Sequence, residues 1–166
     1  MKLRTALLPL CLLAALPATA ATRGFDVRDM VALDRVSSPV LSPDGGVVVF
    51  VQRQMDKEVT KASTGLWVRN LLTRDMAPPK RLTPEGMNAN SPVFSPDGKT
   101  VYFLSGKSGS QQLYSIAVSG GAPRQLTSFA LDVGSYKLSP DGARVAFSVE
   151  SFAECKADFA CTQKRL

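Results

Sequence analysis

The side chain that most often performs acid–base chemistry in enzymes is absent, because none of the 166 residues is histidine. Histidine is the usual general base of serine and cysteine hydrolases and the commonest protein ligand of metals. A self-sufficient Ser-His-Asp or Cys-His hydrolase is therefore excluded, as is a histidine-dependent metal site. We expect no catalytic, cofactor-binding or metal-binding residues in this chain, and no cofactor.

One glycine-rich segment resembles a catalytic motif and a phosphate-binding motif but matches neither in full. Residues 106–110 read Gly-Lys-Ser-Gly-Ser, which lacks the last glycine of the Gly-x-Ser-x-Gly nucleophile elbow. A phosphate-binding loop ending in Gly-Lys-Ser needs a glycine at position 101, where the chain has Val101. We interpret this segment as a turn between two strands.

Aspartates recur in a fixed setting. Ser-Pro-Asp-Gly occurs at residues 42–45, 95–98 and 139–142, so the aspartates are 53 and then 44 residues apart. Each aspartate is followed by a valine after four residues and by a phenylalanine after six. These matching flanks indicate an internal repeat. The aspartates could alternatively be metal ligands or catalytic acids, but an aspartate in a turn needs no such role.

The tetrapeptide has the composition of a hairpin turn. Proline sets the backbone for the first corner, aspartate hydrogen-bonds nearby backbone, and glycine accepts the positive φ that ends the turn. The residues that we assign to these structural turns are Pro43, Asp44, Gly45, Pro96, Asp97, Gly98, Pro140, Asp141 and Gly142.

Strand-forming residues surround each turn, as in residues 47–51, 101–104 and 145–147. A third strand follows near Trp67 or Tyr114, and a fourth ends near the next Leu-Thr pair. Four short strands in about 44 residues are typical of one blade of a β-propeller. The sequence therefore predicts an all-β chain with an incomplete propeller over residues 38–166. Its blades cover about 38–84, 91–128 and 134–166, and the third is incomplete.

The first twenty residues predict a cleaved export signal. Lys2 and Arg4 precede an apolar run over residues 6–16, and Ala18-Thr19-Ala20 has the pattern that signal peptidase recognises. Eleven apolar residues are too few to span a bilayer as a helix, which takes about 20. The alternative is a buried helix of the mature fold. We expect an exported protein, periplasmic or secreted, with residues 1–20 removed and no membrane span left.

Residues 21–37 form a short lead-in. Asp26 can cap a helix in which Val27, Met30 and Val31 share one face. Removal of residues 1–20 leaves 146 residues with 18 Lys and Arg against 14 Asp and Glu. These charges are scattered and form no basic stripe with aromatic residues between, so we expect no nucleic-acid partner.

Two cysteines remain after signal removal, Cys155 and Cys161, six residues apart. In an exported protein such a pair predicts a disulfide, and two free thiols are the alternative. A zinc site would need four ligands, which the remaining cysteines cannot supply without histidine.

The repeats resemble the WD-like blades of TolB-like propellers and of the N-terminal propeller of prolyl oligopeptidase-family serine peptidases. A TolB-like protein places a separate α/β domain before its propeller, whereas only 17 residues separate Ala20 from Ser38. The opening Phe25-Asp26, the short helix and the first tetrapeptide look like the start of exported dipeptidyl- or acylaminoacyl-peptidase-like members.

The resemblance implies partners that this chain does not contain. In that family an α/β-hydrolase domain carrying the nucleophile elbow follows the propeller. Two blades and part of a third cannot close a ring of about four to eight blades. We therefore expect a longer protein with a hydrolase domain and the remaining blades; the alternative is a complete small domain that closes by oligomerising.

Three functions are consistent with these observations. The first is the N-terminal propeller fragment of an exported serine peptidase, which gates and positions peptide substrates and is inactive alone. The second is a non-catalytic TolB-like periplasmic propeller that binds protein or carbohydrate. The third is a small adaptor of 146 residues, which predicts a soluble product that folds cooperatively.

Overall fold

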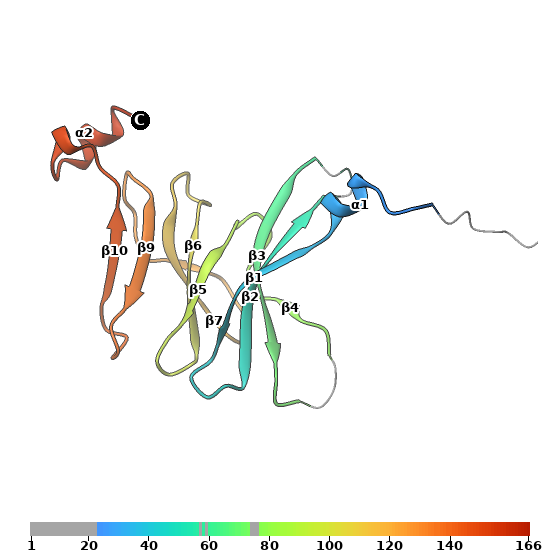
Figure 1. Ribbon diagram of the computed structural model, residues 1–166. Coiled ribbons are helices and arrows are strands. Elements are labelled where there is room, and N and C mark those ends of the chain that lie inside the picture. Colours follow the sequence, from blue (N-terminus) through green and yellow to red (C-terminus); the bar gives the residue numbers. More distant parts are fainter. Residues whose placement is uncertain (1–22, 57, 59, 74–76) are drawn as a thin grey trace, which may run out of the picture.

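The computed structural model describes residues 23–56, 58, 60–73 and 77–166. The expected export signal, residues 1–20, lies outside the described residues. The described chain forms three antiparallel sheets that stand side by side in chain order (Figure 1). They do not close into a ring within these residues. The expectation of an all-β, incomplete propeller is confirmed.

Two of the sheets are four-stranded blades in which each strand pairs with the next along the chain. Blade 1 contains β1 (Arg35–Leu41), β2 (Val47–Met55), β3 (Ala62–Asn70) and β4 (Lys80–Arg81). Blade 2 contains β5 (Asn90–Phe94), β6 (Thr100–Ser105), β7 (Gln112–Ala117) and β8 (Arg124–Gln125). Blade 3 contains β9 (Val133–Leu138) and β10 (Val145–Val149), followed by the 3-10 helix η1 (Ala153–Cys155) and by α2 (Phe159–Gln163).

The first blade begins slightly earlier than expected. Strand β1 starts at Arg35, which pairs with Arg53 of β2, three residues before the expected boundary at residue 38. The pairing register then shifts between Ser37 and Val40. Ser38 has a φ of 50°. The bulge interrupts the ladder without ending the strand, so both sides belong to β1.

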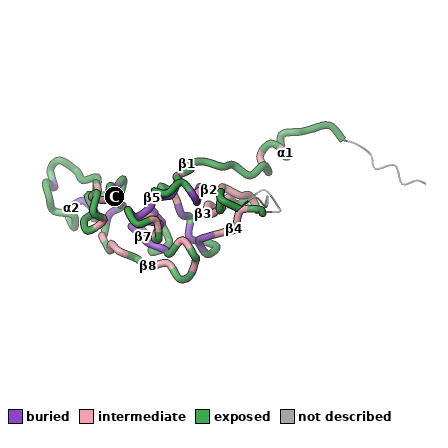
Figure 2. Tube along the Cα trace, turned by 90° about the horizontal axis from the view of Figure 1, so that it is seen from below, coloured by how far each residue is buried: buried purple, intermediate pink, exposed green. Residues whose placement is uncertain are grey.

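The lead-in helix forms as α1 (Val27–Ala32). The Asp26 carboxylate accepts hydrogen bonds from the backbone N–H groups of Arg28 and Asp29, and Asp29 accepts one from Asp26 in return. This capping box satisfies the free donors of the first turn. None of the helix residues is buried, and α1 projects away from the blades (Figure 2).

The apolar core lies between the blades. Val49 and Val51 of β2 share one buried cluster with Val101 and Phe103 of β6. Leu104, the next residue of β6, belongs to a second cluster with blade 3. Because side chains alternate across a strand, blade 2 is covered on both faces.

Successive turns also touch. A Cβ added at Gly98 would lie 3.3 Å from Cδ of Pro43, and one at Gly142 would lie 3.0 Å from Cδ of Pro96. Gly98 and Gly142 therefore each pack against the turn proline of the preceding blade. Gly45, in the first turn, has no atom within 4 Å of the same position.

This difference gives a matched pair of substitutions. Gly45 and Gly142 have nearly equal φ angles, +71° and +70°. We expect Gly45→Ala to lower the free energy of unfolding by about 1–2 kcal/mol, the cost of a side chain in the left-handed region. Gly142→Ala should cost about 1–2 kcal/mol more, because its methyl group collides with Pro96. Urea unfolding followed by circular dichroism measures both; equal costs would contradict the stacking of the turns.

The three turn aspartates share one hydrogen-bond pattern. Oδ1 of Asp44 accepts from Oγ of Ser42 at 2.5 Å and from the backbone N–H of Gly46 at 3.0 Å. Asp97 and Asp141 make the corresponding bonds in their own turns. The serine hydroxyl and then the backbone N–H hold the pKa of each carboxyl below its usual value.

These lowered pKa values predict how the stability of the fold changes at acidic pH. A carboxyl with a lower pKa in the folded than in the unfolded chain stabilises the fold above its unfolded value, 3.8. This stabilisation is lost as the pH falls through the folded pKa values. We expect the melting temperature to fall less between pH 5 and about pH 2 when Asp44, Asp97 and Asp141 are all changed to Asn. An unchanged acid response in the triple variant would contradict this role.

Candidate functional site

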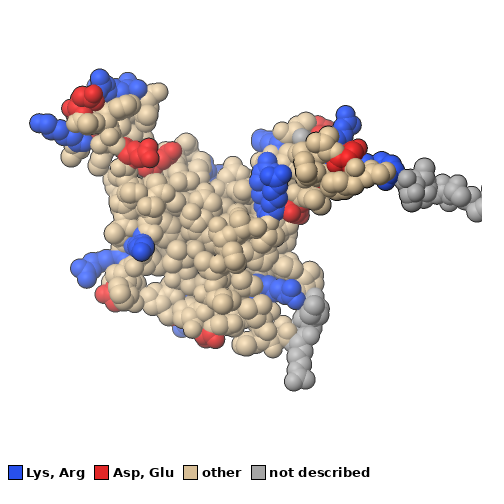
Figure 3. All heavy atoms as spheres, viewed as in Figure 1, with Lys and Arg blue, Asp and Glu red and all other residues tan. Residues whose placement is uncertain are grey.

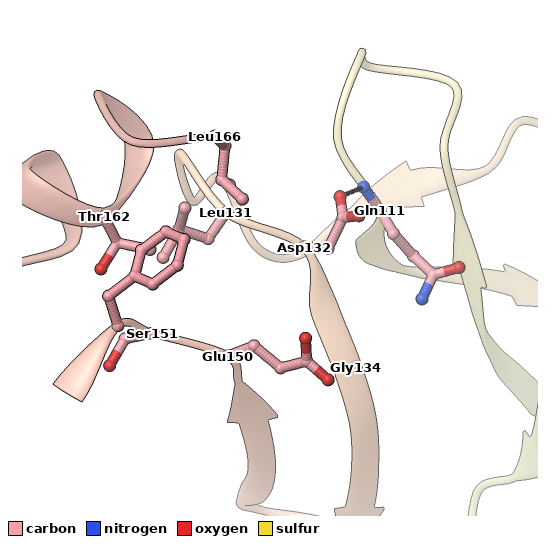
Figure 4. A pocket seen from close by; sticks show the side chains of 9 residues that line it. Gln111, Leu131, Asp132, Gly134, Glu150, Ser151, Thr162 and Leu166 are labelled. Carbon is pink, nitrogen blue, oxygen red and sulfur yellow. Dashed lines mark hydrogen bonds between the residues drawn. The ribbon is translucent and has the colours of Figure 1, made fainter.

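One pocket lies between blades 2 and 3, where the segment after β10 turns over the start of β9 (Figure 4). Its volume is about 410 Å³. The lining residues are Gln111, Leu131, Asp132, Gly134, Glu150, Ser151, Phe152, Thr162 and Leu166.

Two carboxylates face this pocket. Asp132 lies just before β9, and its Oδ1 accepts a hydrogen bond of 2.5 Å from the backbone N–H of Gln111. Glu150 follows β10 directly, and its side chain points across the pocket toward Gly134 (Figure 4). The pocket thus combines negative charge with apolar walls from residues such as Leu131 and Phe152.

The walls of the pocket contain a buried hydroxyl. Thr162 of α2 is 2% exposed, and its Oγ1 has no hydrogen-bond partner among the described residues. A buried hydroxyl without a partner costs about 1–3 kcal/mol. Sequence reasoning did not predict α2 or this residue, because a five-residue helix has too few residues to show a period.

A buried glutamine holds the loop that carries the pocket. Gln112 is 1% exposed. Its Nε2 donates to Oγ of Ser110 and to the carbonyls of Phe129 and Leu131. Its Oε1 accepts from Oγ1 of Thr127 and from the backbone N–H of Phe129. Sequence reasoning missed Gln112; the signal was a glutamine where the aligned position of the first repeat has Gly65.

The cysteines lie beside the pocket. Cys155 is buried at the end of η1, Cys161 lies in α2, and their Sγ atoms are at bonding distance with the Cα atoms 5.6 Å apart. The turn residues lie elsewhere, at the hairpins of blades 1 to 3. The structure therefore does not bring these two predicted groups together.

The turn prolines line a second opening among the innermost strands β1, β5 and β9. This groove of about 740 Å³ includes Pro43, Pro96 and Pro140. Tyr136 of β9 also lines it and donates a 2.7 Å hydrogen bond to the carbonyl of Ser91 in β5. Burial raises the pKa of the Tyr136 hydroxyl, which therefore stays protonated as this donor.

The described residues contain no histidine and no cysteine outside the Cys155–Cys161 pair. No group of three Cys, Asp or Glu side chains is placed to hold a metal in this part of the chain. On the face shown in Figure 3, positive and negative side chains lie next to one another on the two projecting parts and are sparse over the middle. Within the described segments, no helix has the length and hydropathy to cross a membrane.

The repeat, the stacked sheets and the turns lead to one family. Residues 28–163 match the TolB beta propeller domain. The chain belongs to this propeller family. The matched range includes nearly all of the lead-in helix, the three blades and the segment with the two cysteines.

Several relatives of this propeller chain are named as peptidases. The uncharacterized peptidase YuxL of Bacillus subtilis is 30% identical over 122 residues, which are 73% of this chain and 18% of that protein. Dipeptidyl-peptidase 5 of Porphyromonas gingivalis is 33% identical over 118 residues, 71% of this chain and 17% of that protein. The chain therefore spans less than a fifth of the length of these relatives, and its resemblance to peptidase propellers is confirmed.

Solved structures show the same fold. Uncomplexed Pyrococcus horikoshii acylaminoacyl peptidase matches with a TM-score of 0.57 and 19% identity, over 74% of this chain and 18% of that chain. The β-propeller domain of the Pyrococcus furiosus trilobed protease matches with a TM-score of 0.53 and 18% identity, over 69% of this chain and 34% of that chain. A putative TolB from Agrobacterium tumefaciens matches with a TM-score of 0.53 and 24% identity, over 69% of this chain and 39% of that chain.

Proposed function

We propose that this chain is the N-terminal propeller portion of an exported serine peptidase of the dipeptidyl- or acylaminoacyl-peptidase type. The observation that carries the proposal is the match to two proteins named as peptidases, each at least 30% identical over about 120 residues. The propeller restricts access to the hydrolase domain and helps to position peptides. The acidic pocket of Asp132 and Glu150 and the groove among the innermost strands offer the binding surfaces.

The test compares two proteins from the same gene. We expect the natural-length protein to contain a Gly-x-Ser-x-Gly elbow after residue 166 and to hydrolyse dipeptidyl or acylaminoacyl chromogenic substrates. Changing the elbow serine to alanine should lower kcat by at least about 1,000-fold, because the nucleophile is lost. Residues 21–166 alone should show no turnover, since they contain no histidine.

A TolB-like binding protein is the second candidate, supported by the fold match to the Agrobacterium protein. It predicts further blades without an elbow, and no turnover by the natural-length protein. That result would refute the peptidase proposal.

Export and the disulfide belong to the same proposal. The charged start, the apolar run and Ala18-Thr19-Ala20 support cleavage after Ala20 and delivery to the periplasm or medium. An oxidising compartment allows Cys155 and Cys161 to pair. Their positions at bonding distance support this pairing.

We expect a measurable loss of stability when the disulfide between Cys155 and Cys161 is removed. Cys155→Ser together with Cys161→Ser should lower the unfolding free energy of the exported chain by about 2 kcal/mol, the loop entropy of a six-residue closure. Urea unfolding of the oxidised protein and of the double variant measures this loss. Reduction of the unchanged protein should reproduce it, and a double variant as stable as the oxidised protein would contradict the role.

A further inference from the structure

We propose that Arg35 and Arg53, at the end of blade 1 opposite to its turn, form a binding site for a carboxylate group of a peptide. The site is separate from the acidic pocket between blades 2 and 3. The inference rests on the proposed function in one respect, because that function makes a peptide the source of the carboxylate. It goes further in assigning the residues and the class of peptide that they select.

The strand pairing brings the two arginines together. Arg35 of β1 and Arg53 of β2 are directly opposite each other in the antiparallel ladder. Residues in this position project from the same face of a sheet, with their Cβ atoms about 5 Å apart. Two like charges placed in this way destabilise the pairing of the strands. An anion that lies between the two guanidinium groups removes this repulsion.

No carboxylate of the described residues neutralises the pair. Neither guanidinium has an ion pair or a hydrogen bond in this part of the chain. The adjacent carboxylate, that of Asp34, instead accepts from Nε2 of Gln52 at 2.6 Å and from Nε2 of Gln54 at 3.1 Å. Because side chains alternate along β2, these two glutamines lie on the face opposite to Arg53. Neutral amides therefore hold the adjacent acid away from the arginines.

The neighbouring polar side chains on this face can also donate hydrogen bonds. Thr64 of β3 is directly opposite Arg53, and Ser37 lies two residues after Arg35 in β1. The hydroxyls of Ser37 and Thr64 have no hydrogen-bond partner among the described residues. Guanidinium groups supply paired N–H donors that match the two oxygens of a carboxylate. The face thus combines positive charge with several free donors, as the binding of an oxyanion requires.

The site lies where the apolar core ends. On the same face of β2, Val49 and Val51 are 0% and 5% exposed. Arg53 follows them and is half-buried, and Arg35 is exposed. Partial burial reduces the screening of the Arg53 charge by water, so this guanidinium attracts an anion more strongly than a fully exposed one does. The exposed Arg35 leaves the site open to a ligand from solution.

The repeat places this site at the same end of the sheets as the acidic pocket. Arg53 and Glu150 each follow the aspartate of their turn by nine residues, and the equivalent residue of blade 2 is Gly106. Strands β2 and β10 both run from their turns toward the end of the sheets where α1 and α2 lie (Figure 1). A peptide that lies along this end therefore meets positive charge at blade 1, where a carboxylate is attracted, and negative charge at blade 3.

Binding of three peptides to the natural-length protein tests the site, with isothermal titration calorimetry as the measurement. The elbow serine, where present, is changed to alanine so that the peptides are not cleaved. The peptides are Ala-Ala-Ala-Glu amide, Ala-Ala-Ala-Gln with a free carboxylate, and the neutral control Ala-Ala-Ala-Gln amide. We expect one or both carboxylate peptides to bind at least about tenfold more tightly than the control. The tighter of the two shows whether a side chain or the C-terminus supplies the carboxylate.

Substitutions of single arginines assign this preference to the pair. Arg35→Gln and Arg53→Gln should each reduce it to less than about threefold, because one of the two guanidinium groups is lost. Arg53→Lys keeps the charge without the paired donors and should retain part of the preference. The matched control is Arg124→Gln, since Arg124 of β8 is also exposed and has no partner among the described residues. None of these changes should lower the melting temperature by more than about 2 °C.

The outcomes separate this inference from the proposed function. Equal binding of the three peptides, or no measurable binding of either carboxylate peptide, overturns the site even if the protein is an active peptidase. Loss of the preference in Arg124→Gln as well overturns it, because the effect then follows net charge. A larger fall in the melting temperature of either pair variant makes that arginine part of the fold's own contacts and also overturns it. A preference that both pair variants lose, in a protein without turnover, supports the site and refutes the peptidase.

Discussion

Changing Phe103 to alanine is expected to lower the free energy of unfolding by about 4 kcal/mol, the usual cost of removing a fully buried phenylalanine. Phe103 is 0% exposed and belongs to the cluster that joins blades 1 and 2. Its ring stacks on that of Tyr114 with the centroids 5.8 Å apart. The substitution removes the largest fully buried side chain of the described core.

The matched control is Phe152→Ala, because Phe152 is 39% exposed and contacts Arg165 at the surface. We expect this change to cost less than about 1 kcal/mol. Chemical unfolding followed by circular dichroism gives both values. Similar losses for the two phenylalanines would mean that blades 1 and 2 do not stack through Phe103.

The second large effect is expected at Gln112. Gln112→Leu has nearly the same size but cannot hydrogen-bond, so the carbonyl of Leu131 and the N–H of Phe129 lose their partner. The carbonyl of Phe129 keeps only its bond from the hydroxyl of Ser110. Leaving several buried backbone groups without partners should cost about 3 kcal/mol. The loop over residues 127–131 should also lose order, because Gln112 is its main anchor to β7.

A surface glutamine provides the comparison for this prediction. Gln163, at the end of α2, is exposed, and Gln163→Leu should change stability by less than about 0.5 kcal/mol. Hydrogen exchange measured by mass spectrometry reports on the loop directly. Unaltered exchange over residues 127–131 in Gln112→Leu would show that other contacts hold the loop.

The hairpins and their strands could be predicted because their causes are local. Proline, aspartate and glycine each suit one position of the turn, and the valine and phenylalanine that follow alternate as strand residues should. Counting from Asp44, Asp97 and Asp141 therefore located β2, β6 and β10. The lead-in helix could be predicted from the Asp26 cap for the same reason.

The polar groups that tie distant segments together could not be predicted. Tyr136 reaches the carbonyl of Ser91 across 45 residues, and Gln112 reaches a loop 17 to 19 residues ahead. These partners are backbone atoms, which every residue carries, so the side-chain sequence does not mark them. The pocket around Glu150 depends on the path of the chain after β10. The short helices η1 and α2, together with Cys155, determine this path.

Hydrogen exchange of the backbone amides tests the central claim, which is that the repeats stack face to face with blade 2 in the middle. Strands β6 and β7 are covered on both faces, whereas β9 and β10 are covered by other blades on one face within the described residues. We therefore expect the amides of β6 and β7 to exchange more slowly than those of β9 and β10, by at least about tenfold. Equal protection of the two pairs of strands, or slower exchange in β9 and β10, would contradict the stacked arrangement.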